Sequence, residues 1–75
     1  MDYTNKKLTL DDGKTYIVIE QVDFANHSYL YIANREDEDD TSFVEIKDDQ
    51  ILNINPILFS MIIYPLFIKK FQEYN

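Results

Sequence analysis

The sequence contains no cysteine and no tryptophan, and it has one glycine, two prolines and one histidine among 75 residues. Without cysteine, neither a disulfide nor a thiolate metal site can stabilise the fold. The single glycine, Gly13, excludes a glycine-rich phosphate loop, and the single histidine, His27, excludes a histidine metal cluster. No G-x-S-x-G motif frames a nucleophilic serine. We therefore expect a protein that is not an enzyme and that needs no metal and no cofactor.

A chain of this length forms one domain, residues 1–75, which buries only about 60% of the surface that its unfolded chain exposes. Hydrophobic residues make up 45% of it, including six tyrosines and five phenylalanines, so apolar packing or association has to supply the stability. The N-terminal residues lack the apolar run of a secretory signal, and cysteine is absent, so we expect a cytoplasmic protein.

Alternating and β-branched segments predict strands within residues 6–54. Asp12-Gly13 marks a tight hairpin turn after the first strand, and 25–27 marks a second turn. The five consecutive acids of 36–40 predict a solvated loop. The expected strands are 6–10, 15–24, 28–33 and 41–47, with a short fifth strand or extended segment at 50–54.

Asn55-Pro56 predicts the start of a helix, because Asn caps helix N-termini and Pro fits the first helical position. We expect this helix to cover about 56–73, and Pro65 should kink or interrupt it in the middle. The predicted fold is α+β: an antiparallel meander of four to five strands at about 6–54, with one C-terminal apolar helix packed on a face.

The expected helix has no polar face between Ile57 and Ile68. An ordinary surface helix carries one apolar and one polar stripe, so this one has to be covered on both sides. One side can pack on the sheet, and the other needs a second copy, a partner protein or a bilayer. A bilayer fits worst, because the 13 residues of 56–68 span about 20 Å and a membrane span needs about 20 residues. We expect a homodimer, with self-association or docking through Phe59, Ile63, Phe67 and Phe71. The alternative is that the strands wrap the helix more fully than a flat sheet would.

The acidic residues precede the helix: residues 1–55 hold 13 of the 14 acids and sum to −8, whereas 56–75 sum to +1. Such a body repels nucleic acid and anionic lipid and attracts a protein with a basic surface. The plainer alternative is a charged loop that maintains solubility and protects sheet edges. Another is nucleic-acid mimicry, with carboxylates about 6.6 Å apart along one strand face. The expected partner-binding acids are Glu36, Asp37, Glu38, Asp39, Asp40, Glu45, Asp48 and Asp49.

The order of these parts resembles the YrzB-like family of small acidic bacterial proteins. The resemblance covers residues 6–50, and it implies a short acidic protein without known chemistry, with no functional residues to carry over. Members of that family end in a charged helix, whereas 57–68 is apolar here. The matching segments are Leu8-Thr9-Leu10-Asp11-Asp12-Gly13-Lys14, the strand to Val22, Ser28-Tyr29-Leu30-Tyr31-Ile32, the acidic run and Phe43-Val44-Glu45-Ile46.

In size, acidity and richness in Asn, Ile and Tyr, the chain is also similar to phage-encoded inhibitors of bacterial defence nucleases, the anti-CRISPR proteins among them. We predict a non-catalytic, acidic protein–protein interaction module that associates with itself or docks through its apolar helix, with no direct contact to nucleic acid. The alternative is a phage or mobile-element inhibitor that acts as a nucleic-acid mimic. A short membrane-associated protein is the remaining alternative.

Overall fold

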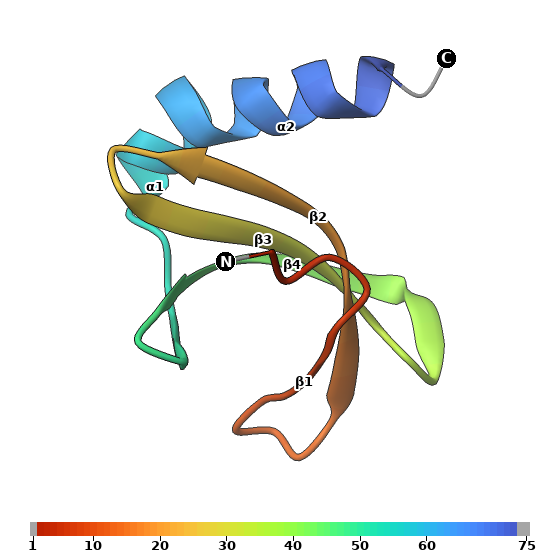
Figure 1. Ribbon diagram of the computed structural model, residues 1–75. Helices are drawn as coiled ribbons and strands as arrows, with labels where there is room; N and C mark the ends of the chain where they lie inside the picture. The colour runs from red at the N-terminus through yellow and green to blue at the C-terminus, as the bar shows by residue number, and fades with distance from the viewer. Residues whose placement is uncertain (1, 74–75) are drawn as a thin grey trace.

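The computed structural model describes residues 2–73, which form one antiparallel sheet of five strands and a C-terminal helical segment (Figure 1). The strand order is β1-β2-β3-β4-β5, so each strand lies beside the next one in the sequence. This confirms the predicted α+β meander with one C-terminal helix. The elements are β1 (Lys7–Thr9), β2 (Thr15–Phe24), β3 (His27–Asn34), β4 (Asp37–Lys47), β5 (Gln50–Leu52), α1 (Pro56–Leu58), the π-helical turn η1 (Phe59–Ile63) and α2 (Tyr64–Gln72).

Left-handed residues close the hairpins. The β2–β3 turn has φ of 52° and 65° at 25–26, and the β4–β5 turn has φ of 51° and 62° at 48–49. Positive φ at both central positions gives a turn whose twist matches that of the flanking strands. Gly13, at φ 79°, lies in the β1–β2 loop, and its N–H donates to the Leu10 carbonyl at 2.9 Å. His27, expected in a turn, already belongs to β3.

A β-bulge divides β2 between the two faces of the sheet. The pairing of β2 with β3 slips by one residue at Ile19, between Val18 and Glu20. An extra residue inverts the in-and-out alternation of a strand. Val18 therefore packs in the cluster on one face, whereas Val22 packs under the helix on the other face.

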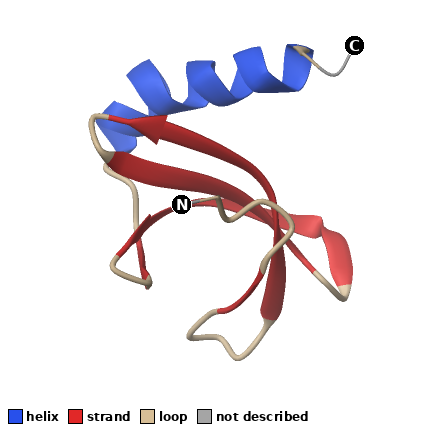
Figure 2. Cartoon of the chain, in the orientation of Figure 1, coloured by secondary structure: helices blue, strands red, loops and turns tan. Residues whose placement is uncertain are grey.

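The curled sheet holds one hydrophobic cluster on its concave side and a second one beneath the helix, which lies outside the curl (Figure 2). Leu8 of β1 and Ile51 of β5 both pack on the concave cluster, so the two ends of the sheet curve toward the same core. The inner cluster consists of buried Tyr16, Val18, Leu30, Ile32, Val44 and Ile46. The helix cluster consists of buried Val22, Tyr29, Ile63 and Phe67.

The helix begins where the sequence predicts. The Asn55 side-chain oxygen accepts hydrogen bonds from the N–H groups of Ile57 at 2.9 Å and Leu58 at 3.2 Å. Pro56 occupies the first turn, where its missing N–H costs nothing.

Pro65 changes the helix without ending it. The turn before it widens into the π-turn η1, in which the Tyr64 N–H donates to the Phe59 carbonyl, five residues back. Proline lacks an N–H and its ring crowds the carbonyl four residues earlier, so a wider turn relieves this conflict. The expected interruption is therefore a local π-turn within a continuous helical segment.

The structure of the acidic residues 36–40 corrects one prediction. We expected 36–40 to be a loop, but β4 begins at Asp37 and only Glu36 stands in the turn before it. The Asn34 side chain accepts from the Glu36 N–H at 2.9 Å, and the Asp37 carboxylate accepts from the Asp39 N–H at 3.1 Å. The hairpin projects into solvent, so strand geometry and exposed charge are compatible here.

Candidate functional site

The four helix residues expected to dock lie against the protein's own sheet. Ile63 and Phe67 are 0% exposed, and Phe59 and Phe71 are half-buried. The Phe43 ring of β4 stands 5.0 Å from the Phe59 ring and 4.9 Å from the Phe67 ring, centroid to centroid. Aromatic packing within the chain contributes to covering these side chains in a single copy, so their docking role stays a prediction.

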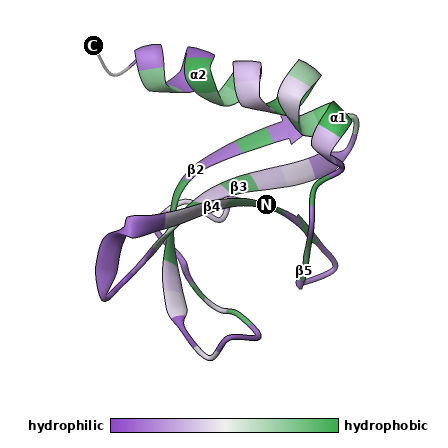
Figure 3. Cartoon of the chain, turned by 180° about the vertical axis from the view of Figure 1, so that it is seen from behind, coloured by the Kyte–Doolittle hydropathy of each residue, from purple (hydrophilic) through white to green (hydrophobic). Residues whose placement is uncertain are grey.

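The opposite side of the helix is apolar and exposed. Ile57 is 70% exposed and Met61 is 73% exposed. Residues four positions apart share one helix face, so these two side chains form an outer stripe. Tyr64, 43% exposed, borders this stripe, and its ring lies 6.0 Å from the Phe43 ring of β4. Hydrophobic colour marks much of the helix in the view of Figure 3.

Sequence reasoning missed the outer stripe, although a signal was present. The bulkiest inward candidates recur every four residues, at Phe59, Ile63, Phe67 and Phe71. That spacing predicts the helix face that packs on the sheet, and the apolar residues between these positions then belong to the exposed face. Because 57–68 is apolar almost throughout, the two faces cannot be told apart by hydrophobicity alone.

The predicted acidic surface falls into two groups at opposite ends of β4. Asp37–Asp40 begin the strand, and Asp48–Asp49 follow its end. Asp40 and Asp48 are eight residues apart, which is about 27 Å of extended chain. The hydrophilic hairpin of the first group lies at the left of Figure 3, and the β5 turn lies at the right.

Glu45 belongs to neither group. It is half-buried, and its Oε2 lies 3.1 Å from Nδ1 of His27. A carboxylate held in this way supports the sheet face near the helix and does not extend an exposed acidic patch.

A polar pocket joins the end of the helix to β2. The Lys70 Nζ lies 3.6 Å from Glu20 Oε1. The Asp23 Oδ1 accepts from Gln21 Nε2 at 2.9 Å and from Ser28 Oγ at 2.8 Å. These hydrogen bonds, that of Gln21 first, hold the pKa of Asp23 below its usual value. Of these contacts, the one between Lys70 and Glu20 joins the C-terminal half of the helix to the sheet.

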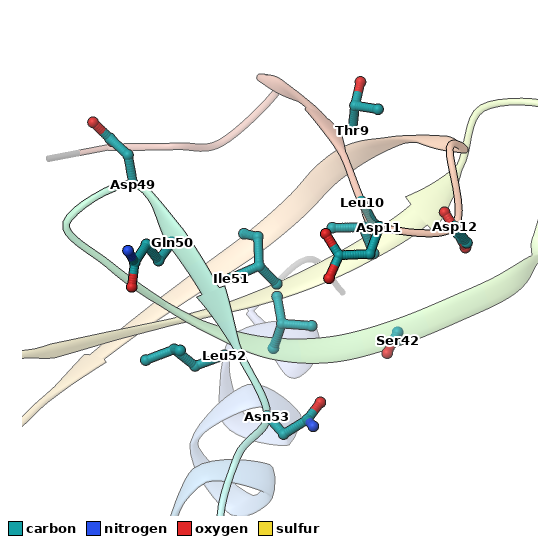
Figure 4. Close-up of a pocket in the computed structure, with 11 residues that line it drawn as sticks. Thr9, Leu10, Asp11, Asp12, Ser42, Asp49, Gln50, Ile51, Leu52 and Asn53 are labelled. Carbon is teal, nitrogen blue, oxygen red and sulfur yellow. The ribbon is translucent and has the colours of Figure 1, made fainter.

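A groove of about 750 Å³ separates the two ends of the curled sheet (Figure 4). Figure 4 shows Thr9 to Asp12 on one side and Asp49 to Asn53 on the other, with β4 passing between them. Val44, Leu10 and Ile51 give the groove an apolar floor continuous with the inner cluster, and three aspartates stand around it. The lining residues are Thr9, Leu10, Asp11, Asp12, Ser42, Val44, Asp49, Gln50, Ile51, Leu52 and Asn53.

Within residues 2–73, no group of three or more histidine and acidic side chains is arranged to hold a metal ion. In the same part of the chain, no helix combines the length and the apolar content needed to cross a membrane.

No protein-family model matches the chain, and no match is found among curated proteins or solved structures. The resemblance to the YrzB-like family therefore stays a prediction. Three surfaces of the described residues are candidates for a function: the outer stripe, the two acidic groups and the groove.

Proposed function

We propose that the protein is a non-catalytic, acidic interaction module that pairs with a second copy of itself through the outer stripe of its helix. The observation that carries this proposal is the exposure of Ile57 and Met61, which leave 70% and 73% of their surface in solvent. Adjacent apolar side chains this exposed on a small protein are typical of an interaction surface. A second copy would remove them from water.

The charge distribution favours a second copy as the occupant. Each chain carries a net charge of −7, and residues 1–55 sum to −8. Contact between two sheets would bring like charges together, which opposes association. Residues 56–75 sum to +1, so two copies meet through their helices with little repulsion.

Two-fold symmetry suits a stripe of this kind. In an isologous dimer the same patch serves both copies, so the stripe has to be self-complementary. Two helices packed antiparallel, about 8–10 Å apart, would place Met61 near the symmetry axis. The flexible Met side chain adapts to irregular gaps, which suits a contact with itself.

Solution mass tests this proposal. We expect light scattering to give a dimer mass that falls toward the monomer on dilution, and we expect Met61→Glu to be monomeric at concentrations where the wild type is dimeric. Ile19→Glu is the matched control, because Ile19 is 43% exposed but lies on β2. A wild type that stays monomeric at every concentration would show that the proposal is wrong.

A single introduced cysteine gives an independent test, since the chain has no thiol of its own. Met61→Cys should form a disulfide-linked dimer under mild oxidation, because the symmetry axis brings the two thiols together. Thr41→Cys, exposed on β4, should not do so. Equal cross-linking of both variants would indicate random collision and would count against the stripe.

The dimer leaves its two acidic groups free in the cytoplasm for a protein with a basic surface.

One observation also favours the nuclease-inhibitor alternative: Asp37–Asp40 stand on a strand and not in a loop. A mimic should bind a basic nuclease, lose affinity as salt rises and be displaced by DNA. If DNA fails to displace it, or if the double variant Asp37→Asn/Asp39→Asn inhibits equally well, the acidic run is not a mimic.

A further inference from the structure

The two end strands of the sheet run in the same direction. Every neighbouring pair from β1 to β5 is antiparallel, so four reversals bring β5 parallel to β1. Adjacent strands of an up-and-down meander alternate in direction, so β1 and β5 cannot close this sheet by an antiparallel pairing with each other. One additional strand, antiparallel to both, would close it.

On the β1 side, main-chain groups point into the groove. The Leu10 N–H donates to the Lys14 carbonyl at 3.1 Å, and the Lys6 carbonyl accepts from the Val18 N–H at 2.9 Å, so both residues face β2. Antiparallel pairing alternates between residues that face the neighbouring strand and residues that face away from it. The N–H and C=O of Thr9 are therefore directed away from β2, toward the groove that Thr9 lines.

The β5 side has the same arrangement. Lys47 and Gln50 flank the two-residue turn 48–49, and the pair that flanks such a turn is hydrogen-bonded. The next residue, Ile51, therefore directs its N–H and C=O away from β4 and toward the groove. Among residues 2–73, no strand pairs with this edge of β5 or with the outer edge of β1.

The groove has an apolar floor and an acidic rim. Leu10 and Ile51 pack on the inner cluster beneath it, so an apolar side chain that points inward would meet an apolar surface. Asp11 and Asp49 are exposed on opposite sides, so the outward side chains of a bound strand would meet carboxylates. An extended strand points successive side chains to opposite faces, which matches this division.

We propose that this groove binds an extended segment of a partner protein, in which apolar and basic residues alternate, as a sixth strand antiparallel to both β1 and β5. Hydrogen bonds to Thr9 and Ile51 supply the main-chain contacts. Charge complementarity with Asp11 and Asp49 selects a basic segment over an acidic one. Closure of the sheet removes both exposed edges.

The probe is a synthetic heptapeptide of alternating lysine and valine with blocked ends. Its binding is followed by NMR of the ¹⁵N-labelled protein, in both the wild type and Met61→Glu, so that the result does not depend on the helix dimer. We expect the Thr9 and Ile51 amide protons to exchange about tenfold more slowly when the peptide is bound. The Leu10 amide, which already donates to Lys14, should change little.

Two matched controls test the charge and the pairing. A glutamate–valine heptapeptide should not bind, and N-methylation of the central residues of the lysine peptide should abolish binding. The double variant Asp11→Asn/Asp49→Asn should weaken binding of the lysine peptide about fivefold, and Asn suits the positive φ of 62° at residue 49.

Three outcomes would overturn the proposal. The first is absence of binding, and the second is equal binding of the lysine and glutamate peptides. The third is protection of Thr9 and Ile51 that rises with protein concentration without any peptide, because a second copy would then be the occupant. Protection of both amides by the lysine peptide alone supports the proposal.

Discussion

The hydroxyl of Tyr16 shares its one proton between Asp40 Oδ2, 3.2 Å away, and Asp12 Oδ2, 3.0 Å away. Asn34 Nδ2 donates to the same Asp40 oxygen at 3.1 Å. One phenol of the inner cluster therefore connects the end of the acidic run to the β1–β2 loop. Burial first, and then these two hydrogen bonds, raise the pKa of Tyr16 to about 12.

The raised pKa of Tyr16 predicts a loss of stability in alkali. In the unfolded chain the phenol ionises near pH 10, whereas in the fold it keeps its proton until about 12. Between these values the unfolded state binds fewer protons, so the free energy of unfolding falls as the pH rises. We expect the urea midpoint of Tyr16→Phe to fall less steeply over this pH range than that of the wild type. Parallel slopes for the two proteins would contradict this account.

Ala25 occupies a left-handed conformation that suits glycine better. Its φ is 52°, and the Cβ of a non-glycine residue makes this region unfavourable by about 1–2 kcal/mol. Glycine avoids this conformational cost, but it also makes the unfolded chain more flexible, which offsets part of the gain. Ala25→Gly should therefore stabilise the fold by about 1 kcal/mol. The melting temperature should rise by about 4–8 °C. Asp48→Gly, at φ 51°, is the control and should gain less, because Asp tolerates this region better than Ala.

The Asn55 cap should contribute measurably to the helix. Its side chain satisfies two N–H groups of the first turn, so Asn55→Ala should lower the free energy of unfolding by about 1 kcal/mol. Asn53→Ala removes an exposed amide just before the helix and should change stability by less than about 0.5 kcal/mol. Equal melting temperatures for the two variants would mean that the cap adds nothing.

Much of the fold follows from local signals. Alternation and turn residues predict the strand order, and Asn55-Pro56 predicts the helix start. The bulge at Ile19 could not be predicted, because nothing in Tyr16-Ile17-Val18-Ile19 shows where the register slips. The position of the register shift depends on β2 contributing side chains to both hydrophobic clusters, one on each face, and this is a property of the whole sheet.

The candidate sites were harder to predict than the fold. The acids of 36–40 look like a loop by composition, yet β4 begins at Asp37, which pairs with Asn34 of β3. Residues 38–40 lie at the irregularity between this pair and the next one, Ala33 with Thr41. The groove depends on how far the sheet curls, which brings the ends β1 and β5 over one core. Such long-range placement leaves no mark on the spacing of residues in the sequence.

A pair of helix variants separates packing from docking. Phe67 is 0% exposed against the sheet, so Phe67→Ala should cost about 3–5 kcal/mol and leave much of this small domain unfolded by circular dichroism. Phe67→Leu keeps most of the volume, so it should stay folded and dimeric. Met61 is 73% exposed, so Met61→Ala should change monomer stability by less than about 0.5 kcal/mol and still weaken the dimer.

The opposite pattern would revise the interface. If Phe67→Ala stays folded but loses the dimer while Met61→Ala keeps it, the helix leaves its own sheet and exchanges with that of a second copy. Phe67 would then dock as the sequence first indicated, and its burial against Phe43 would describe only the unpaired chain. Circular dichroism and light scattering on the same samples decide between the two, because one reports folding and the other reports association.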